Sequence, residues 1–96
     1  MAVARIFEGR GWTPEQYDRL IDALQERLGL AEGRTAQGVL FHWAAQTPDG
    51  MRAVDVYESR EAADRLVNET IGPVAGDLGL PMPEITELEV HNTLAR

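Results

Sequence analysis

A tight turn with the sequence Thr-Pro-Asp-Gly at residues 47–50 constrains the fold more than any other feature, because alternating runs of β-forming residues flank it. Residues 38–57 are therefore predicted to form a β-hairpin. If the first and last turn residues pair, His42 lies opposite Asp55; a pairing shifted by two residues places His42 opposite Tyr57 instead. Side chains alternate between the two faces of a strand. In either register His42, Asp55 and Tyr57 therefore share one face.

The two faces of this hairpin differ in chemistry. One carries an imidazole, a carboxylate and a phenol, and in the first register it also places Leu40 opposite Tyr57. The other face is apolar and consists of Phe41, Trp43, Val54 and Val56. The polar face is the better indication of where a functional site lies.

One amphipathic helix is expected before the hairpin in the sequence and one after it. The first begins after Thr13, which starts a capping box, and ends at Gly29. The apolar stripe along residues 17–28 is assigned to the core. The second helix begins after Ser59 and is predicted to end at Gly72-Pro73, because proline does not continue a helix, with one short extra turn expected over residues 74–78.

Residues 1–8 and 84–94 alternate in polarity and are predicted to be strands. The resulting order, β-α-β-β-α-β, is that of the ferredoxin-like α+β fold, in which both helices cover one face of a four-stranded antiparallel sheet. We expect the apolar face of the sheet to pack against the helices. The opposite face includes Phe7, Leu40 and Tyr57 and is too apolar to be left in water, which favours a second copy placed face to face.

The composition restricts the classes of function. The 96 residues form one domain, 1–96, with a formal charge of −7, which argues against binding to nucleic acid or to anionic membranes. No apolar run is long enough to span a membrane, and the first residues lack the layout of a signal peptide, so a cytoplasmic location is expected.

The residue types that are absent narrow the possible chemistry further. The chain has no Cys and no Lys, all nine basic residues are Arg, and its one Ser is expected to cap a helix. Disulfides, thiol nucleophiles, Schiff bases and serine hydrolase chemistry are thereby disfavoured. No nucleotide-binding motif occurs, and the two His lack zinc-site spacing, so we expect no cofactor and no metal.

The polar hairpin face supplies the candidate catalytic residues. His42 is a candidate general base, because a neutral imidazole takes up protons near neutral pH, and Asp55 is expected to orient it. Tyr57 is a candidate donor to a substrate oxygen. The alternative is that His42 and Asp55 form a buried pair that fixes strand register or the dimer.

Four further residues are candidates for substrate binding: Arg5, Phe7, Leu40 and His91. Arg5 is suited to holding an oxyanion, but it can equally pair with Asp55, Glu87 or Glu89. His91 is a candidate second acid or base, or an interface residue. Trp12 and Trp43 are expected in the core, with Trp43 facing the helices.

The opening ARIFEG, the hairpin and its continuation GVLFHWAAQTPDGMRAVDVYESREAADRL, and the ending VHN resemble the antibiotic biosynthesis monooxygenase-like proteins. This resemblance covers nearly the whole chain, and its most specific piece is the Asp-Val-Tyr-Glu-Ser at residues 55–59. It implies a dimeric α/β barrel, formed by a homodimer, with a cavity for a small apolar or aromatic molecule. The helix over 60–70 carries no His, so the haem-degrading branch of that superfamily is not matched.

The resemblance implies a small-molecule enzyme, cofactor-independent and monooxygenase-like, that acts on an electron-rich aromatic or enolisable substrate by proton abstraction. Without dioxygen, the same step would give isomerisation or cyclisation. The alternative is a non-catalytic homodimeric domain that binds a small ligand or is purely structural.

Overall fold

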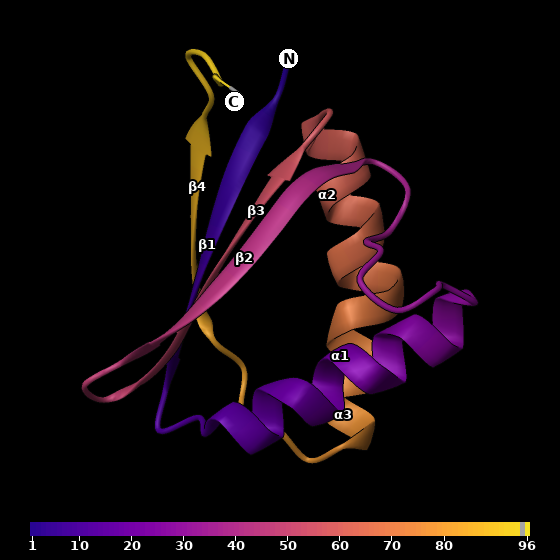
Figure 1. Ribbon diagram of the computed structural model, residues 1–96, viewed down its shortest axis with the longest axis vertical. Coiled ribbons are helices and arrows are strands. Elements are labelled where there is room, and N and C mark those ends of the chain that lie inside the picture. Colours follow the sequence, from indigo (N-terminus) through magenta and orange to yellow (C-terminus); the bar gives the residue numbers. More distant parts are fainter. Residues whose placement is uncertain (95) are drawn as a thin grey trace.

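The computed structural model describes residues 1–94 and 96, and it contains one antiparallel sheet covered on one face by helices (Figure 1). The strands lie in the order β2-β3-β1-β4. Their bounds are β1 Val3–Arg10, β2 Val39–Thr47, β3 Gly50–Tyr57 and β4 Glu84–Glu89. The helices are α1 Pro14–Leu28, α2 Arg60–Leu66 and α3 Gly72–Asp77, with a π-helical segment, η1, over Val67–Ile71. The predicted ferredoxin-like α+β fold is confirmed.

Helix α1 begins and ends as its sequence predicts. The Thr13 hydroxyl accepts a hydrogen bond from the Gln16 backbone, and the Gln16 side chain accepts one from the Thr13 backbone, which completes the capping box. Gly29 ends the helix in the left-handed conformation, with φ at 66°. A residue without Cβ adopts that conformation at little cost.

The second helical region differs from the prediction, because Gly72-Pro73 does not end it. The chain continues from α2 through η1 into α3 (Figure 1). In η1 the backbone hydrogen bonds span five residues, one more than in an α-helix. The amide of Gly72 accordingly donates to the carbonyl of Val67. Pro73 has no amide hydrogen, and a local π-helical turn shifts the hydrogen-bond register around it. The helix therefore continues past the proline.

The hairpin pairs in the first predicted register, with Thr47 opposite Gly50 and His42 opposite Asp55. One expectation is wrong: Val39, not Leu40, pairs with Tyr57. A β-bulge lies between Val39 and Phe41, and Leu40 is its extra residue.

The C-terminal ends of β1 and β4 also differ from the prediction. Strand β1 continues to Arg10 because the long hairpin supplies partners for Gly9 and Arg10 in β3. Strand β4 ends at Glu89 because its partner β1 begins at Val3. One further hydrogen bond, from Val90 to Ala2, follows, and His91 lies beyond the sheet.

The sheet faces are the reverse of the expected arrangement, and the placement of Trp43 against the helices is wrong. The face with the polar residues packs against the helices, where Arg5 pairs with Asp64 of α2. The apolar face points away from the helices and leaves large side chains exposed: Phe41 (46%), Trp43 (45%) and Leu88 (54%). Strand alternation determines which residues share a face, but not which face receives the helices.

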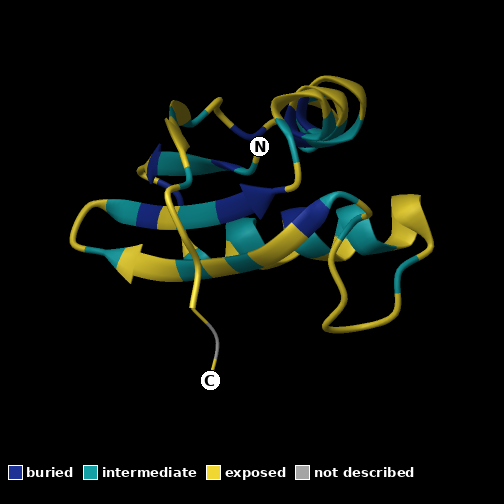
Figure 2. Cartoon of the chain, turned by 90° about the horizontal axis from the view of Figure 1, so that it is seen from above, coloured by how far each residue is buried: buried dark blue, intermediate teal, exposed yellow. Residues whose placement is uncertain are grey.

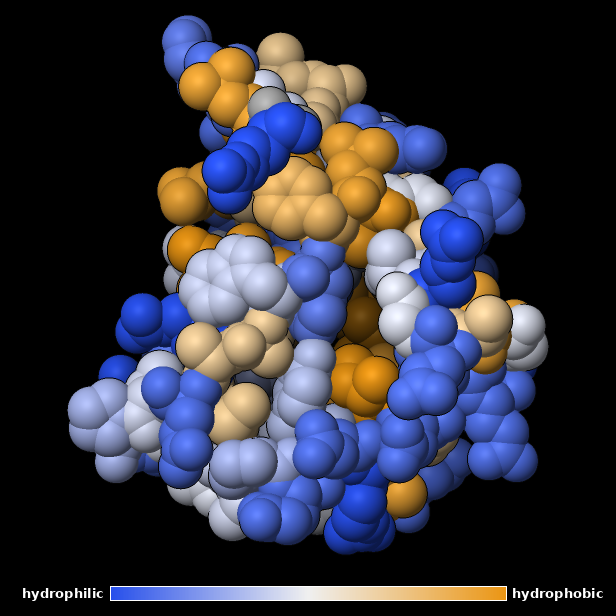
Figure 3. All heavy atoms as spheres, viewed as in Figure 1, coloured by the Kyte–Doolittle hydropathy of each residue, from blue (hydrophilic) through white to orange (hydrophobic). Residues whose placement is uncertain are grey.

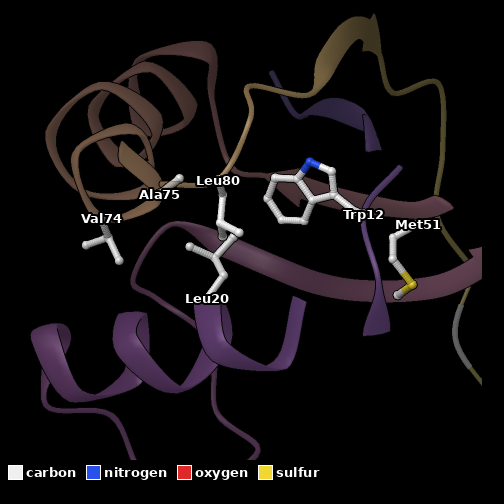
Figure 4. Close-up of a cluster of buried hydrophobic side chains, with 6 residues drawn as sticks. All are labelled: Trp12, Leu20, Met51, Val74, Ala75 and Leu80. Atoms are coloured by element: carbon white, nitrogen blue, oxygen red, sulfur yellow. The ribbon is translucent and has the colours of Figure 1, made fainter. Parts of the chain in front are cut away.

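The interior consists of two small clusters of buried side chains. One lies near the turn end of the sheet and contains Trp12, Leu20, Met51, Val74, Ala75 and Leu80 (Figure 4). The other lies at the opposite end and contains Val3, Val39, Tyr57 and Ala63. Buried segments are short and alternate with exposed ones, including along the strands (Figure 2). The space between the clusters is only partly filled by protein.

Candidate functional site

A cavity of about 500 Å³ lies between the helix-facing side of the sheet and the helices. Apolar residues from both layers line it, among them Phe7, Leu24, Ala53, Val67 and Ile71. In the space-filling view a hollow with hydrophobic side chains at its bottom opens near the middle of the molecule (Figure 3). This volume is in the range of small-molecule sites.

A chain of four polar side chains lies at the wall of this cavity. The Tyr17 hydroxyl, on α1, contacts His42 Nε2. His42 Nδ1 contacts Asp55 Oδ1, and the Tyr57 hydroxyl donates to Asp55 Oδ2 at 2.6 Å. Tyr17, His42 and Asp55 all line the cavity.

The network fixes the tautomer of His42. An ionised carboxylate only accepts hydrogen bonds, so Nδ1 of His42 carries the hydrogen that is donated to Asp55. In the neutral imidazole Nε2 is then the acceptor, and it receives the hydrogen of the Tyr17 hydroxyl. An imidazole with its acceptor at Nε2 and a carboxylate on Nδ1 is one arrangement that is suited to general-base chemistry.

Both tyrosines of the network stay protonated far above neutral pH. Burial, followed by the charges of Asp55 and Asp18, raises the pKa of Tyr17 to about 12. Burial and the neighbouring Asp55 carboxylate raise the pKa of Tyr57 as well. Each phenol is therefore a hydrogen-bond donor at physiological pH, and neither is a standing base.

The structure places the predicted catalytic residues together, but they differ in how far they are exposed and in whether they line the cavity. His42 is partly exposed and Asp55 is 6% exposed, whereas Tyr57 has no exposed surface and does not line the cavity. As arranged, the Tyr57 hydroxyl is directed at Asp55 and not at a substrate oxygen. It orients the carboxylate that orients His42.

The predicted substrate-binding residues divide into two groups. Phe7 and Leu40 line the cavity, Leu40 from the bulge of β2. Arg5 does not line it; its guanidinium instead forms an ion pair with Glu87, one of the alternatives the sequence left open, and another with Asp64, which was not among them. His91 is exposed beyond β4 and is not brought to the other candidates.

Sequence reasoning missed Tyr17, because it begins the apolar stripe of α1 and was assigned to the core. The available signal was its hydroxyl, which is a polar group on a face that otherwise packs inward. The Tyr17 and His42 rings are parallel within 1°, with their centroids 6.0 Å apart. Trp12 is buried as predicted and also forms part of the cavity wall.

Comparison with solved structures shows the fold that this cavity belongs to. A protein of Chloroflexus aurantiacus J-10-fl, provisionally assigned as an antibiotic biosynthesis monooxygenase, superposes with a TM-score of 0.66 at 22% identity, covering 99% of this chain and 98% of that one. A variant of SnoaB, a cofactor-independent oxygenase from Streptomyces nogalater, gives 0.62 at 16% identity, with 99% and 96% covered. A dimeric ferredoxin-like protein of unknown function from Jannaschia sp. CCS1 gives 0.62 at 13%, with 94% and 100% covered.

The chain thus has the fold of antibiotic biosynthesis monooxygenase-like proteins, as its sequence resemblance implies. No protein-family model and no curated protein matches the sequence. At these identities the structural similarity establishes the fold.

Two absences hold for the residues that the structure describes. No helix among them is long and apolar enough to cross a membrane. No group of three or more His, Asp or Glu side chains among them is placed to hold a metal ion.

Proposed function

We propose that this protein is a small-molecule enzyme that binds a neutral, electron-rich aromatic or enolisable substrate in the cavity and removes a proton from it. The observation that carries the proposal is the Tyr17–His42–Asp55 chain at the wall of an apolar cavity. An imidazole oriented by a buried carboxylate is a general base, and the apolar surroundings suit a flat hydrophobic ring.

The charge of the cavity wall supports a neutral substrate. Of the described lining residues, Arg34 is the one arginine, and it is exposed. Asp55 is the one carboxylate, and His42 and Tyr57 satisfy it. A substrate carboxylate or phosphate would find no buried cationic partner there, and burying an unpaired charge is costly.

The proposed reaction needs no resident cofactor. Removal of a proton leaves an electron-rich phenolate or enolate, which can react with dioxygen directly. For an anthrone, the CH₂ group becomes C=O: one atom of dioxygen becomes the carbonyl oxygen and the other leaves as water with the two hydrogens, so the substrate supplies all four electrons. Without dioxygen, return of the proton at another atom gives isomerisation, and attack by the carbanion within the substrate gives cyclisation.

We further propose that the protein acts as a homodimer formed through the outer face of the sheet. That face exposes Phe41, Trp43 and Leu88, which is unusual for a surface left in water. The Jannaschia protein of the same fold is dimeric. Association through this face would leave the cavity, on the other side of the sheet, open to a substrate.

Anthrone is a suitable probe, because it is uncharged, aromatic and enolisable. Under anaerobic conditions in D₂O, the protein is expected to accelerate deuterium exchange of the anthrone CH₂ group above the uncatalysed rate, as followed by NMR. Admission of dioxygen should then give oxygen uptake and anthraquinone. Exchange without oxygen uptake would point to an isomerase or cyclase.

The matched variant for this test is His42→Asn, because the Asn amide can still donate to Asp55 while Nε2 is lost. It is expected to bind anthrone, as detected by thermal shift, and to lose the accelerated exchange. A wild-type protein that binds anthrone without accelerating exchange would contradict proton abstraction and favour a ligand-binding domain. Ala53→Leu, which fills the cavity, should abolish the thermal shift.

A further inference from the structure

Tyr17 and His42 both line the cavity, and they contact each other in a way that a simple general base would not require. Its hydroxyl occupies Nε2, the nitrogen that would accept the substrate proton. Tyr17 also lines the cavity and comes from the helix layer, opposite the sheet that carries His42. When a substrate enters the cavity, the lone pair of His42 Nε2 is therefore already engaged in a hydrogen bond with Tyr17.

We propose that Tyr17 is the catalytic residue that contacts the substrate, and that His42 acts through it. This inference rests on the proposed function. The Tyr17 oxygen accepts the proton from the breaking C–H or O–H bond of the substrate, while its own hydrogen moves to His42 Nε2. The products are the substrate anion and a His42 imidazolium that remains hydrogen-bonded to Asp55. One proton has moved from substrate to His42, and the phenol is restored.

The placement of the charges favours this relay over a free phenolate. Asp55 and Asp18 are the carboxylates that act on Tyr17, and both disfavour a negative charge on its oxygen. Tyr17 can then take the substrate proton only while it gives up its own. The positive charge produced in that step lies on His42, directly beside the Asp55 carboxylate, which stabilises it.

The relay also assigns a second task to the same hydroxyl. Once the proton has passed, the restored Tyr17 O–H is a neutral donor beside the new substrate anion. A donor already in position for a developing negative charge lowers the barrier to its formation. Tyr57 cannot supply this contact, because it is fully buried and bonded to Asp55.

The variant Tyr17→Phe distinguishes the relay from direct attack by His42. If Tyr17 relays the proton, the variant should lose deuterium exchange into anthrone by about 100-fold, the scale of general acid–base catalysis, while still giving a thermal shift with anthrone. If His42 acts directly, removal of the hydroxyl exposes Nε2, and exchange should be retained or increased. Retained exchange would overturn the relay and leave the proposed function standing.

Two comparisons keep the result interpretable. Tyr57→Phe makes the same chemical change at the far end of the network and should reduce exchange less than Tyr17→Phe. Equal losses in the two variants would overturn the contact between Tyr17 and substrate. Thermal unfolding verifies that each variant is folded, and Tyr17→Leu replaces the Phe variant if that one is not. Absence of exchange in the wild type would instead contradict the proposed function.

Discussion

The Tyr57 hydroxyl donates a 2.6 Å hydrogen bond to Asp55 Oδ2, two residues before it on the same face of β3. Both side chains are buried, Tyr57 completely. This hydrogen bond gives Oδ2 of Asp55 a partner, while Oδ1 of the same carboxylate is paired with His42. The buried charge of Asp55 is tolerated because each of its oxygens has a partner.

Tyr57→Phe should therefore destabilise the protein by about 2 kcal/mol, the usual range for a hydrogen bond to a charged group. The ring keeps its packing against Val3 and Ala63, so the loss reports the hydroxyl. Urea unfolding followed by circular dichroism measures the change. A variant as stable as the wild type would show that water replaces the phenol at Asp55.

His42→Ala should cost more stability than His42→Asn, because only the asparagine can still donate to Asp55. Leaving a buried group without its hydrogen-bond partner costs about 1–3 kcal/mol, and more for a charged group; Asp55 keeps its bond to Tyr57, so we expect a loss of about 3 kcal/mol. The two variants are compared by urea unfolding at neutral pH. Equal stabilities would mean that the pair contributes little to the fold.

The chain has two tyrosines, which makes their ionisation easy to follow. Tyr17 has a pKa of about 12 in the folded protein against an ordinary value of 10.0, and Tyr57 is raised as well. Phenolate absorbance in the ultraviolet should thus remain low as the pH passes 10. Phenolate absorbance with a midpoint at 10 in the folded protein would contradict the burial of both rings.

The same shift determines how stability depends on pH. Below pH 10 the Tyr17 phenol is protonated in both the folded and the unfolded chain. The raised pKa therefore contributes its full stabilisation to the folded state in this range. Between about pH 10 and 12 the unfolded chain loses this proton while the folded chain keeps it, so the free energy of unfolding falls. Tyr17→Phe should reduce the slope of this decline, as measured by thermal unfolding across that range.

Trp43→Glu should prevent or weaken self-association, because it places a charge on the exposed apolar face. Analytical ultracentrifugation is expected to show a dimer for the wild type and a monomer for the variant. Gln37→Glu adds the same charge in an exposed loop and should leave the dimer intact. A monomeric wild type, or a dimer that survives Trp43→Glu, would contradict association through this face.

Local rules were sufficient for most of the backbone. The capping box at Thr13, the left-handed Gly29 and the turn at residues 47–50 set helix ends and strand register through nearby atoms. The alternation of residues placed His42, Asp55 and Tyr57 on one face, with His42 opposite Asp55 in one of the two predicted registers. These features depend on a few neighbouring residues. For that reason they could be inferred without knowledge of the tertiary structure.

The errors concern interactions between distant segments. Which face of the sheet receives the helices depends on the whole assembly, and the apolar face lies outside although a single chain would favour it inside. The continuation past Pro73 depends on a shift of hydrogen bonds in η1 that no local residue preference predicts. Tyr17 reaches His42 only because α1 crosses the sheet, a contact over 25 positions in sequence.

The bulge at Leu40 lets the cavity change shape independently of its chemistry. The turn at residues 47–50 fixes the pairing of His42 with Asp55, and the bulge lies on the far side of that pair. Because Leu40 lines the cavity as an extra residue, its loss or replacement would alter the wall without moving the imidazole. A one-residue change in the length of this hairpin would therefore change which molecules fit the cavity, with His42 and Asp55 held in place.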